Sequence, residues 1–148
     1  MLIDQIRAEL NAATKNRDKL RQRTLRSVIA AVQEAEVSGD EARTLDDDEV
    51  QGVLKALVKR GRDAAEAFDA GGRTDRGDDE RAEIAVLEEF LPAALSDDEL
   101  VAIVERQLAD GGFATKADMG SAMKAVNAEV AGRADGRRVA DLVKSRLD

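Results

Sequence analysis

Apolar residues recur every three or four positions through almost all of this 148-residue chain, and no segment shows the strict alternation of a β-strand. This spacing places apolar side chains along one face of a helix, where they can pack against another helix. The first such stripe includes Ile3, Ile6 and Leu10 and predicts a helix over about 2–15. The sequence therefore predicts an all-α protein.

Capping residues and glycines indicate where the next two helices begin and end. The stripe of a second helix, over 20–35, stops near Gly39. A third helix is predicted to begin after Asp46, with Glu49 three residues later completing a capping box. It ends at Gly71, which is followed by a second glycine.

A fourth helix, over about 74–91, ends before Pro92, because the residue that precedes a proline avoids the helical conformation. The proline is also the best candidate for a domain boundary. We expect a four-helix N-terminal domain over 1–92 and a small three-helix C-terminal domain over 93–148, joined by a short hinge rather than a flexible linker.

The three helices of the second domain each follow a capping residue. Ser96 and Glu99 form a capping box before the fifth helix, which stops at the glycine pair 111–112. Thr115 has the same relation to Asp118 before the sixth helix, and Asp135 caps the seventh.

The composition excludes several kinds of function. The chain has no cysteine and no histidine, so it cannot form a zinc finger, an iron–sulfur cluster or a Ser-His-Asp triad. Glycine-rich phosphate loops and dinucleotide-binding fingerprints are also missing. The acidic triplets at 46–48 and 78–80 lack the spacing of a calcium loop and are explained by helix dipoles. We therefore expect no catalytic residue, no metal site and no cofactor.

The N-terminus lacks the apolar core of an export signal, because charged residues interrupt it from Asp4 onward. No apolar run approaches the roughly 20 residues of a membrane span. The absence of cysteine fits a reducing compartment. We expect a cytoplasmic protein with no membrane partner.

The net charge of −8, from 23 basic and 31 acidic residues, argues against general affinity for nucleic acid and against DNA as a partner. One segment is nevertheless basic. Six cations and one acidic residue lie between 15 and 26, and Lys15, Lys19, Arg23 and Arg26 have the spacing of one helix face. This face could bind phosphates, or it could pair with acidic residues of a neighbouring helix.

A second basic candidate lies near the C-terminus. Arg133, Arg137 and Arg138 flank the predicted turn around Asp135, where helix N-terminal amides could bind a phosphate. The alternative is a plain turn with basic residues at its rim.

Three segments in order resemble the signature of the YqeY-like proteins of the GatB/YqeY family. They are LEEFLPAALS at 87–96, KADMGSAM at 116–123 and GRADG at 132–136. RTLRS at 23–27 and RTD at 73–75 fit the same family, so the resemblance spans the whole chain. It implies kinship with the tail domain of the GatB subunit of the tRNA-dependent amidotransferase, a helical module that contacts the body of tRNA.

The resemblance also implies which positions face RNA, with Arg23 and Arg26 as weaker candidates than the others. The full set is Lys116, Gly120, Lys124, Arg133, Arg137, Arg138, Arg23 and Arg26. Met119 and Met123 are expected to be structural. Gly120 lies inside a predicted helix, where glycine costs about 1 kcal/mol, and close packing of another helix is the preferred explanation over the approach of an RNA backbone.

We therefore expect a helical tRNA-interacting module that assists tRNA aminoacylation or transamidation in translation without catalysing it. The first alternative is a protein-interaction adaptor for a tRNA synthetase or an amidotransferase subunit. A further alternative, implied by the family relationship, is carbon–nitrogen ligase activity with glutamine as amido-N-donor, for which the chain shows no nucleophile or ATP site.

Overall fold

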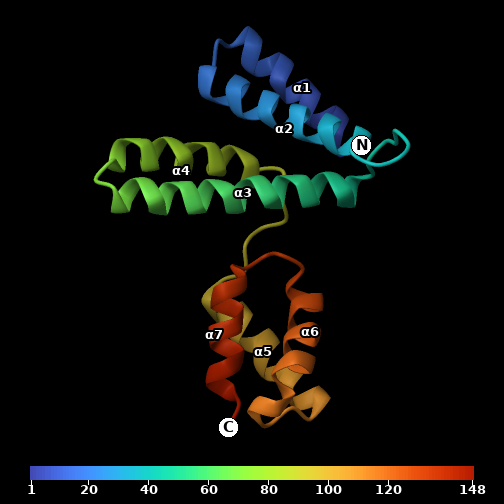
Figure 1. Ribbon diagram of the computed structural model, residues 1–148, viewed down its shortest axis with the longest axis vertical. Coiled ribbons are helices and arrows are strands. Elements are labelled where there is room, and N and C mark those ends of the chain that lie inside the picture. Colours follow the sequence, from blue (N-terminus) through green and yellow to red (C-terminus); the bar gives the residue numbers. More distant parts are fainter. The chain divides into compact units, whose positions relative to one another are not determined.

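The computed structural model describes residues 1–148 and contains seven α-helices, one short 3-10 helix and no strands (Figure 1). The prediction of an all-α protein is confirmed. The chain divides into two compact units, Met1–Pro92 and Ala93–Asp148, which are described separately below. None of the helices has the length and apolar character that a membrane span requires.

Unit 1 consists of two antiparallel helical hairpins (Figure 1). The first hairpin pairs α1 (Leu2–Lys15) with α2 (Lys19–Val37), and the second pairs α3 (Asp47–Ala70) with α4 (Thr74–Glu88). All four helices contribute to one hydrophobic core. Its fully buried side chains are Ile6, Leu25, Val28, Val32, Val50 and Leu54.

The predicted start of α3 is confirmed. The Asp46 carboxylate accepts a hydrogen bond from the Glu49 backbone N–H at 2.8 Å, and the flanking residues Leu45 and Val50 are both buried. Asp18 caps α2 in the same way, accepting from the Arg21 N–H at 3.2 Å, although the sequence analysis did not identify it.

The fourth helix ends three residues earlier than predicted, at Glu88. The N–H groups of Glu89, Phe90 and Leu91 donate to carbonyls three residues back rather than four, so the chain tightens into 3-10-type turns. Pro92 accounts for this change, because it disfavours helical geometry at the residue before it.

Two buried glycines lie where α3 and α4 pack closely. A Cβ on Gly61 of α3 would lie 2.9 Å from Cγ1 of Ile84. A Cβ on Gly77 of α4 would lie 3.3 Å from the Ala65 carbonyl oxygen and 2.4 Å from an Asp69 carboxylate oxygen. Each glycine therefore provides room for the opposite helix, and a larger residue would force the helices or side chains to shift.

We predict that Gly61→Ala leaves the protein about 1–3 kcal/mol less stable than Gly52→Ala does, measured by urea denaturation. Gly52 is the matched control because it lies exposed in the same helix and its added Cβ would meet nothing within 4 Å. The control should gain about 0.5–1 kcal/mol from helix propensity. Equal gains for the two variants would contradict close packing at Gly61.

Unit 2 contains α5 (Asp97–Gly111), the 3-10 helix η1 (Lys116–Asp118), α6 (Met119–Val130) and α7 (Gly136–Arg146). The three α-helices enclose a second hydrophobic core. Its fully buried side chains are Leu100, Val104, Ala122, Val126, Val130, Val139 and Val143.

The capping box predicted for α5 is confirmed. The Ser96 hydroxyl accepts from the Glu99 N–H at 3.1 Å, and the Glu99 carboxylate accepts from the Ser96 N–H at 2.9 Å. The sixth predicted helix instead begins as the 3-10 turn η1 and becomes α-helical only at Met119.

Whether each unit folds as an independent domain stays a prediction. We expect separate fragments 1–92 and 93–148 to be helical and to unfold cooperatively, because each contains its own buried core. The fragment 93–148 should be the less stable one, since chains of about 60 residues bury a smaller share of their surface. Circular dichroism during thermal unfolding checks this, and a non-cooperative melt of either fragment would contradict it.

Candidate RNA-contacting surface

The basic segment 15–26 does not form one continuous helix face. Lys15 is the last residue of α1 and Arg17 lies in the following turn, whereas α2 begins only at Lys19. The prediction that Lys15 shares a face with Lys19, Arg23 and Arg26 is therefore wrong for Lys15, because a turn separates the two helices. The other three lie at positions i, i+4 and i+7 of α2.

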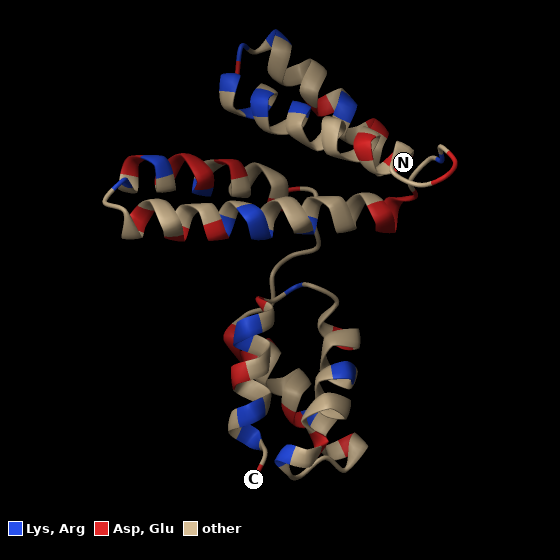
Figure 2. Cartoon of the chain, in the orientation of Figure 1, with Lys and Arg blue, Asp and Glu red and all other residues tan.

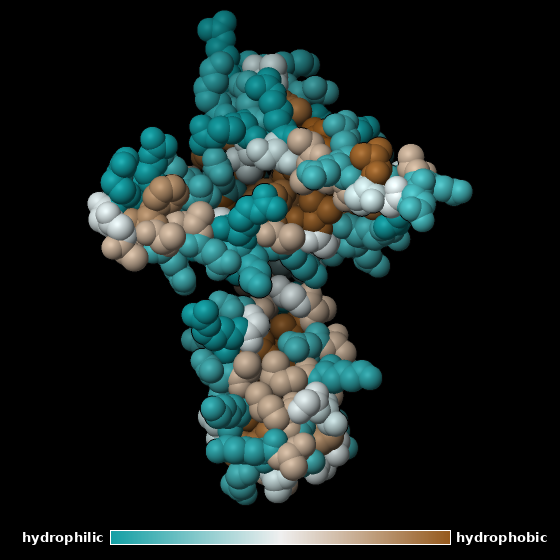
Figure 3. Space-filling view, in the orientation of Figure 1, coloured by the Kyte–Doolittle hydropathy of each residue, from teal (hydrophilic) through white to brown (hydrophobic).

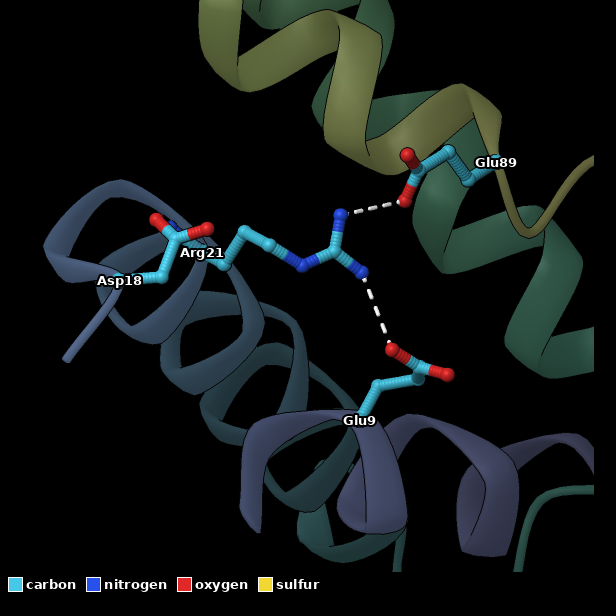
Figure 4. Close-up of polar contacts among 4 residues, drawn as sticks. All are labelled: Glu9, Asp18, Arg21 and Glu89. Carbon is cyan, nitrogen blue, oxygen red and sulfur yellow. Dashed lines mark hydrogen bonds and ion pairs between the residues drawn. The ribbon is translucent and has the colours of Figure 1, made fainter. Parts of the chain in front are cut away.

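Two arginines of this segment pair with acidic residues of other elements. Arg21 donates to a Glu89 carboxylate oxygen at 2.7 Å and to a Glu9 carboxylate oxygen at 3.2 Å, which joins α2 to α1 and to the end of α4 (Figure 4). The hydrogen bond to Glu89 is the main reason that the pKa of Arg21 is raised. Arg23 Nε donates to Glu83 at 2.9 Å. For these two residues the alternative of pairing with neighbouring helices is correct.

The remaining cations of the segment are exposed and form no ion pair. They are Lys15, Arg17, Lys19 and Arg26, of which Arg26 makes a single long contact of 3.5 Å to the Gln22 side-chain oxygen. They lie around the α1–α2 turn and along the outer side of α2, where blue residues gather in Figure 2.

The turn between α6 and α7 is held by its own arginines. Arg133 Nε donates to the Ala93 carbonyl at 2.9 Å, and the Arg133 carbonyl accepts from the Leu95 N–H at 2.8 Å. Arg138 pairs with Asp97 at the start of α5. These contacts hold the turn between α6 and α7 against the first residues of unit 2.

The N-terminus of α7, which follows this turn, already binds a carboxylate of the chain itself. The Asp135 carboxylate accepts from the Arg137 backbone N–H at 2.9 Å, as expected for the cap of α7. The Arg137 side chain is exposed and forms no ion pair. Of the three arginines predicted to bind RNA at this turn, only Arg137 therefore has a guanidinium group without a partner in the chain.

Lys116, Gly120 and Lys124 lie four residues apart along η1 and α6, and all three are exposed. Neither lysine forms an ion pair, although Asp118 lies two residues after Lys116. We call these three residues the α6 stripe. Met119 and Met123, on the neighbouring side of the helix, pack against the core of unit 2 as structural residues.

The surroundings of Gly120 contradict the explanation preferred from the sequence, that another helix packs against this glycine. A Cβ at this position would meet nothing within 4 Å, so no other helix packs against it. The prediction that helix packing explains this glycine is wrong, because its side of α6 faces outward. Within the chain, nothing requires the absence of a side chain at Gly120.

The family model for YqeY-like proteins matches residues 3–147, nearly the whole chain. The chain belongs to the YqeY-like protein family. No curated protein matches its sequence. In this YqeY-like chain the matched region includes nearly all of both units and every basic candidate residue discussed above.

The start of the α6 stripe is fixed by Asp118. Its carboxylate accepts from the backbone N–H groups of Ala114 at 2.9 Å and Thr115 at 3.0 Å, and these two hydrogen bonds lower its pKa. The Lys116 N–H in turn donates to the Asp148 carbonyl at 3.0 Å. The loop before α6 is thereby joined to the end of the chain, and the Lys116 side chain remains outside.

Lys144 is an exposed cation that the sequence analysis did not single out. It lies in the last turn of α7 and forms no ion pair, and four residues later Asp148, beyond the end of the helix, contacts Lys116 through the backbone. The burial of Val139 and Val143 leaves position 144 on the outer side of the helix. The apolar spacing of α7 would therefore have placed Lys144 on the exposed side of the helix.

We predict that Asp118→Asn lowers the melting temperature at pH 7, because the ionised carboxylate is the better acceptor for the two N–H groups. A lowered pKa means that this stabilisation is present above the ordinary carboxyl pKa of about 3.9 and is lost as the pH falls through the folded-state value. The difference from wild type should therefore shrink near pH 2–3.

The matched control is Asp141→Asn, which changes an exposed carboxylate of α7 that has no hydrogen-bond partner. It should leave the melting temperature nearly unchanged at both pH values. An Asp118→Asn effect that is the same at neutral and acidic pH would contradict the role of the ionised carboxylate.

Proposed function

We propose that this YqeY-like chain is a tRNA-interacting module that assists tRNA aminoacylation or transamidation without catalysing it. The observation that carries the proposal is the α6 stripe, in which two exposed and unpaired lysines flank a glycine with open space before it. Lysine ammonium groups bind phosphates as point charges, and a missing side chain lets a nucleic-acid backbone come close.

The dimensions of the stripe suit a phosphate backbone. Lys116 in the 3-10 helix η1 and Lys124 in α6 are eight residues apart, so their backbone positions are separated by about 12–14 Å of helical rise. They would reach different phosphates, with Gly120 between them. Such contacts recognise the shape of folded RNA and not its sequence, since base edges in an RNA helix are hard to reach.

The charge distribution favours unit 2 as the contacting part. Residues 93–148 contain 8 basic and 10 acidic side chains, whereas residues 1–92 contain 15 basic and 21 acidic ones. Unit 2 therefore repels phosphate less. The acidic N-terminal unit would limit binding to RNA whose shape fits, which is useful for a module that must release its tRNA.

The kinship implied by the sequence signature supports the same function, because the related amidotransferase tail domain contacts the body of tRNA. In this proposal the chain supplies no reacting group. Other proteins act on the reacting end of the tRNA, and the chain's residues contribute affinity and orientation.

We predict that the double variant Lys116→Gln/Lys124→Gln binds tRNA at least about tenfold more weakly than wild type at low salt, measured by fluorescence anisotropy with labelled tRNA. Because binding releases counterions, the slope of log affinity against log salt should become shallower by about two, one for each lost phosphate contact.

The matched control is Lys59→Gln, which removes an exposed and unpaired lysine of α3 in unit 1. It should leave both the affinity and the slope unchanged. The proposal fails if wild-type protein does not bind tRNA at about 50 mM salt, or if it binds an unfolded RNA of the same length equally well.

A second candidate function is a protein-interaction adaptor for a tRNA synthetase or an amidotransferase subunit. The acidic excess of unit 1 favours it, since a basic partner surface would find complementary charge there. Capture of such a protein by the full chain after nuclease treatment, together with no measurable tRNA binding, would favour the adaptor over the RNA-binding module.

A further inference from the structure

Three cations gather at the turn between α1 and α2 of unit 1. Lys15 is the last residue of α1, Arg17 lies in the turn and Lys19 is the first residue of α2. All three side chains are exposed, and none forms an ion pair. We call these three residues the turn cluster. Blue residues mark this end of the first hairpin in Figure 2.

The carboxylates around the start of α2 make other contacts and leave the turn cluster unpaired. The Asp18 side chain accepts from the Arg21 backbone N–H at 3.2 Å, as the cap of α2. Glu9 and Glu89 both accept from the Arg21 guanidinium group. A patch of positive charge therefore remains exposed on a unit in which acidic residues outnumber basic ones.

Arg17 has a backbone conformation that fits glycine better than arginine. Its φ is +57°, in the left-handed region where a Cβ crowds the backbone. The turn itself is held by backbone hydrogen bonds, from the Arg17 N–H to the Thr14 carbonyl at 3.3 Å and from the Asp18 N–H to the Ala13 carbonyl at 3.0 Å. Strained residues of this kind cluster at functional sites. Because the turn makes no use of the guanidinium group, its position favours a role outside the chain.

The surroundings of the turn cluster favour a phosphate backbone over a protein as the partner. Protein interfaces centre on buried aromatic and large apolar side chains. The exposed large apolar residues of this chain, Met1, Val37 and Phe68, all lie outside the segment 11–19. Figure 3 shows a mostly hydrophilic surface at this end of unit 1. Contacts to phosphates require only cations and polar groups, and a guanidinium group can bind one phosphate through two N–H groups.

We propose that the turn cluster contacts phosphates of the same tRNA molecule that the α6 stripe contacts. This inference rests on the proposed function, since it adds a second surface to the same complex. Two weak contacts made by one chain give a higher affinity than either alone, because the second forms at a high effective concentration. The acidic remainder of unit 1 repels phosphate, so the RNA backbone approaches this unit at the turn cluster.

The test compares two charge-matched double variants of the full chain by fluorescence anisotropy with labelled tRNA at about 50 mM salt. Lys15→Gln/Lys19→Gln should weaken binding at least about tenfold and make the slope of log affinity against log salt shallower by about two. The control Lys59→Gln/Arg60→Gln removes two exposed and unpaired cations of α3. It should weaken binding less than about threefold, because it changes only the overall charge of unit 1.

A second pair of variants separates binding from stability. Arg17→Gly should raise the melting temperature, because glycine accepts the left-handed conformation without strain, and should weaken tRNA binding at least about threefold. Ala131→Gly is the matched control, since Ala131 has a φ of +50° in unit 2. It should also raise the melting temperature but leave tRNA binding unchanged. A purely structural Arg17 would behave like this control.

The inference and the proposed function fail in different ways. If Lys116→Gln/Lys124→Gln weakens tRNA binding but the turn variant binds as its charge-matched control does, the inference is overturned and the proposed function stands. If the wild-type chain does not bind tRNA, both are overturned. Analytical ultracentrifugation should show one tRNA per chain. Two tRNA molecules per chain would mean that the surfaces act separately, and would also overturn the inference.

Discussion

Helices α3 and α4 of unit 1 pack closely against each other. Gly61 and Gly77 leave room for the facing helix at two separate places, so the hairpin packs closely at both. Close packing brings Glu83 to where it pairs with Arg23 of α2. The first hairpin is joined to the second through Arg21, which contacts Glu9 and Glu89 (Figure 4).

Arginines and lysines of this chain differ in the contacts that they make, and this difference connects the fold to the proposed function. Arginines such as Arg21 make ion pairs that join helices, and their planar guanidinium groups can bind two partners at once. Lys116 and Lys124 take part in none of them. The lysines of the α6 stripe are therefore available to an external anion, whereas much of the arginine content stabilises the protein itself.

The sequence predicted the helices well because apolar spacing and caps are local signals. Asp46, Ser96 and Asp135 cap the helices that they were expected to cap. The signature segments also led to the correct family. The boundaries differed most where local geometry was special, before Pro92 and at η1, and α2 also ends two residues later than predicted, at Val37.

The contacts between distant residues could not be predicted in the same way. Sequence spacing does not show which helix faces a glycine. Close helix packing was therefore predicted at Gly120, whereas it occurs at Gly61 and Gly77. It also cannot show that Arg133 and Arg138 bind residues 93–97, about 40 positions away. Of the eight residues predicted to face RNA, those that are exposed and form no ion pair are the three of the α6 stripe, Arg137 and Arg26.

We propose that this YqeY-like chain contacts tRNA through the outer side of α6. Crosslinking of the full chain to tRNA, followed by mass spectrometry of the crosslinked peptides, would show which residues lie against the RNA. We expect crosslinks concentrated in peptides that contain residues 116–124, with fewer at Arg137. Crosslinks confined to unit 1, or spread evenly over all exposed lysines, would contradict it.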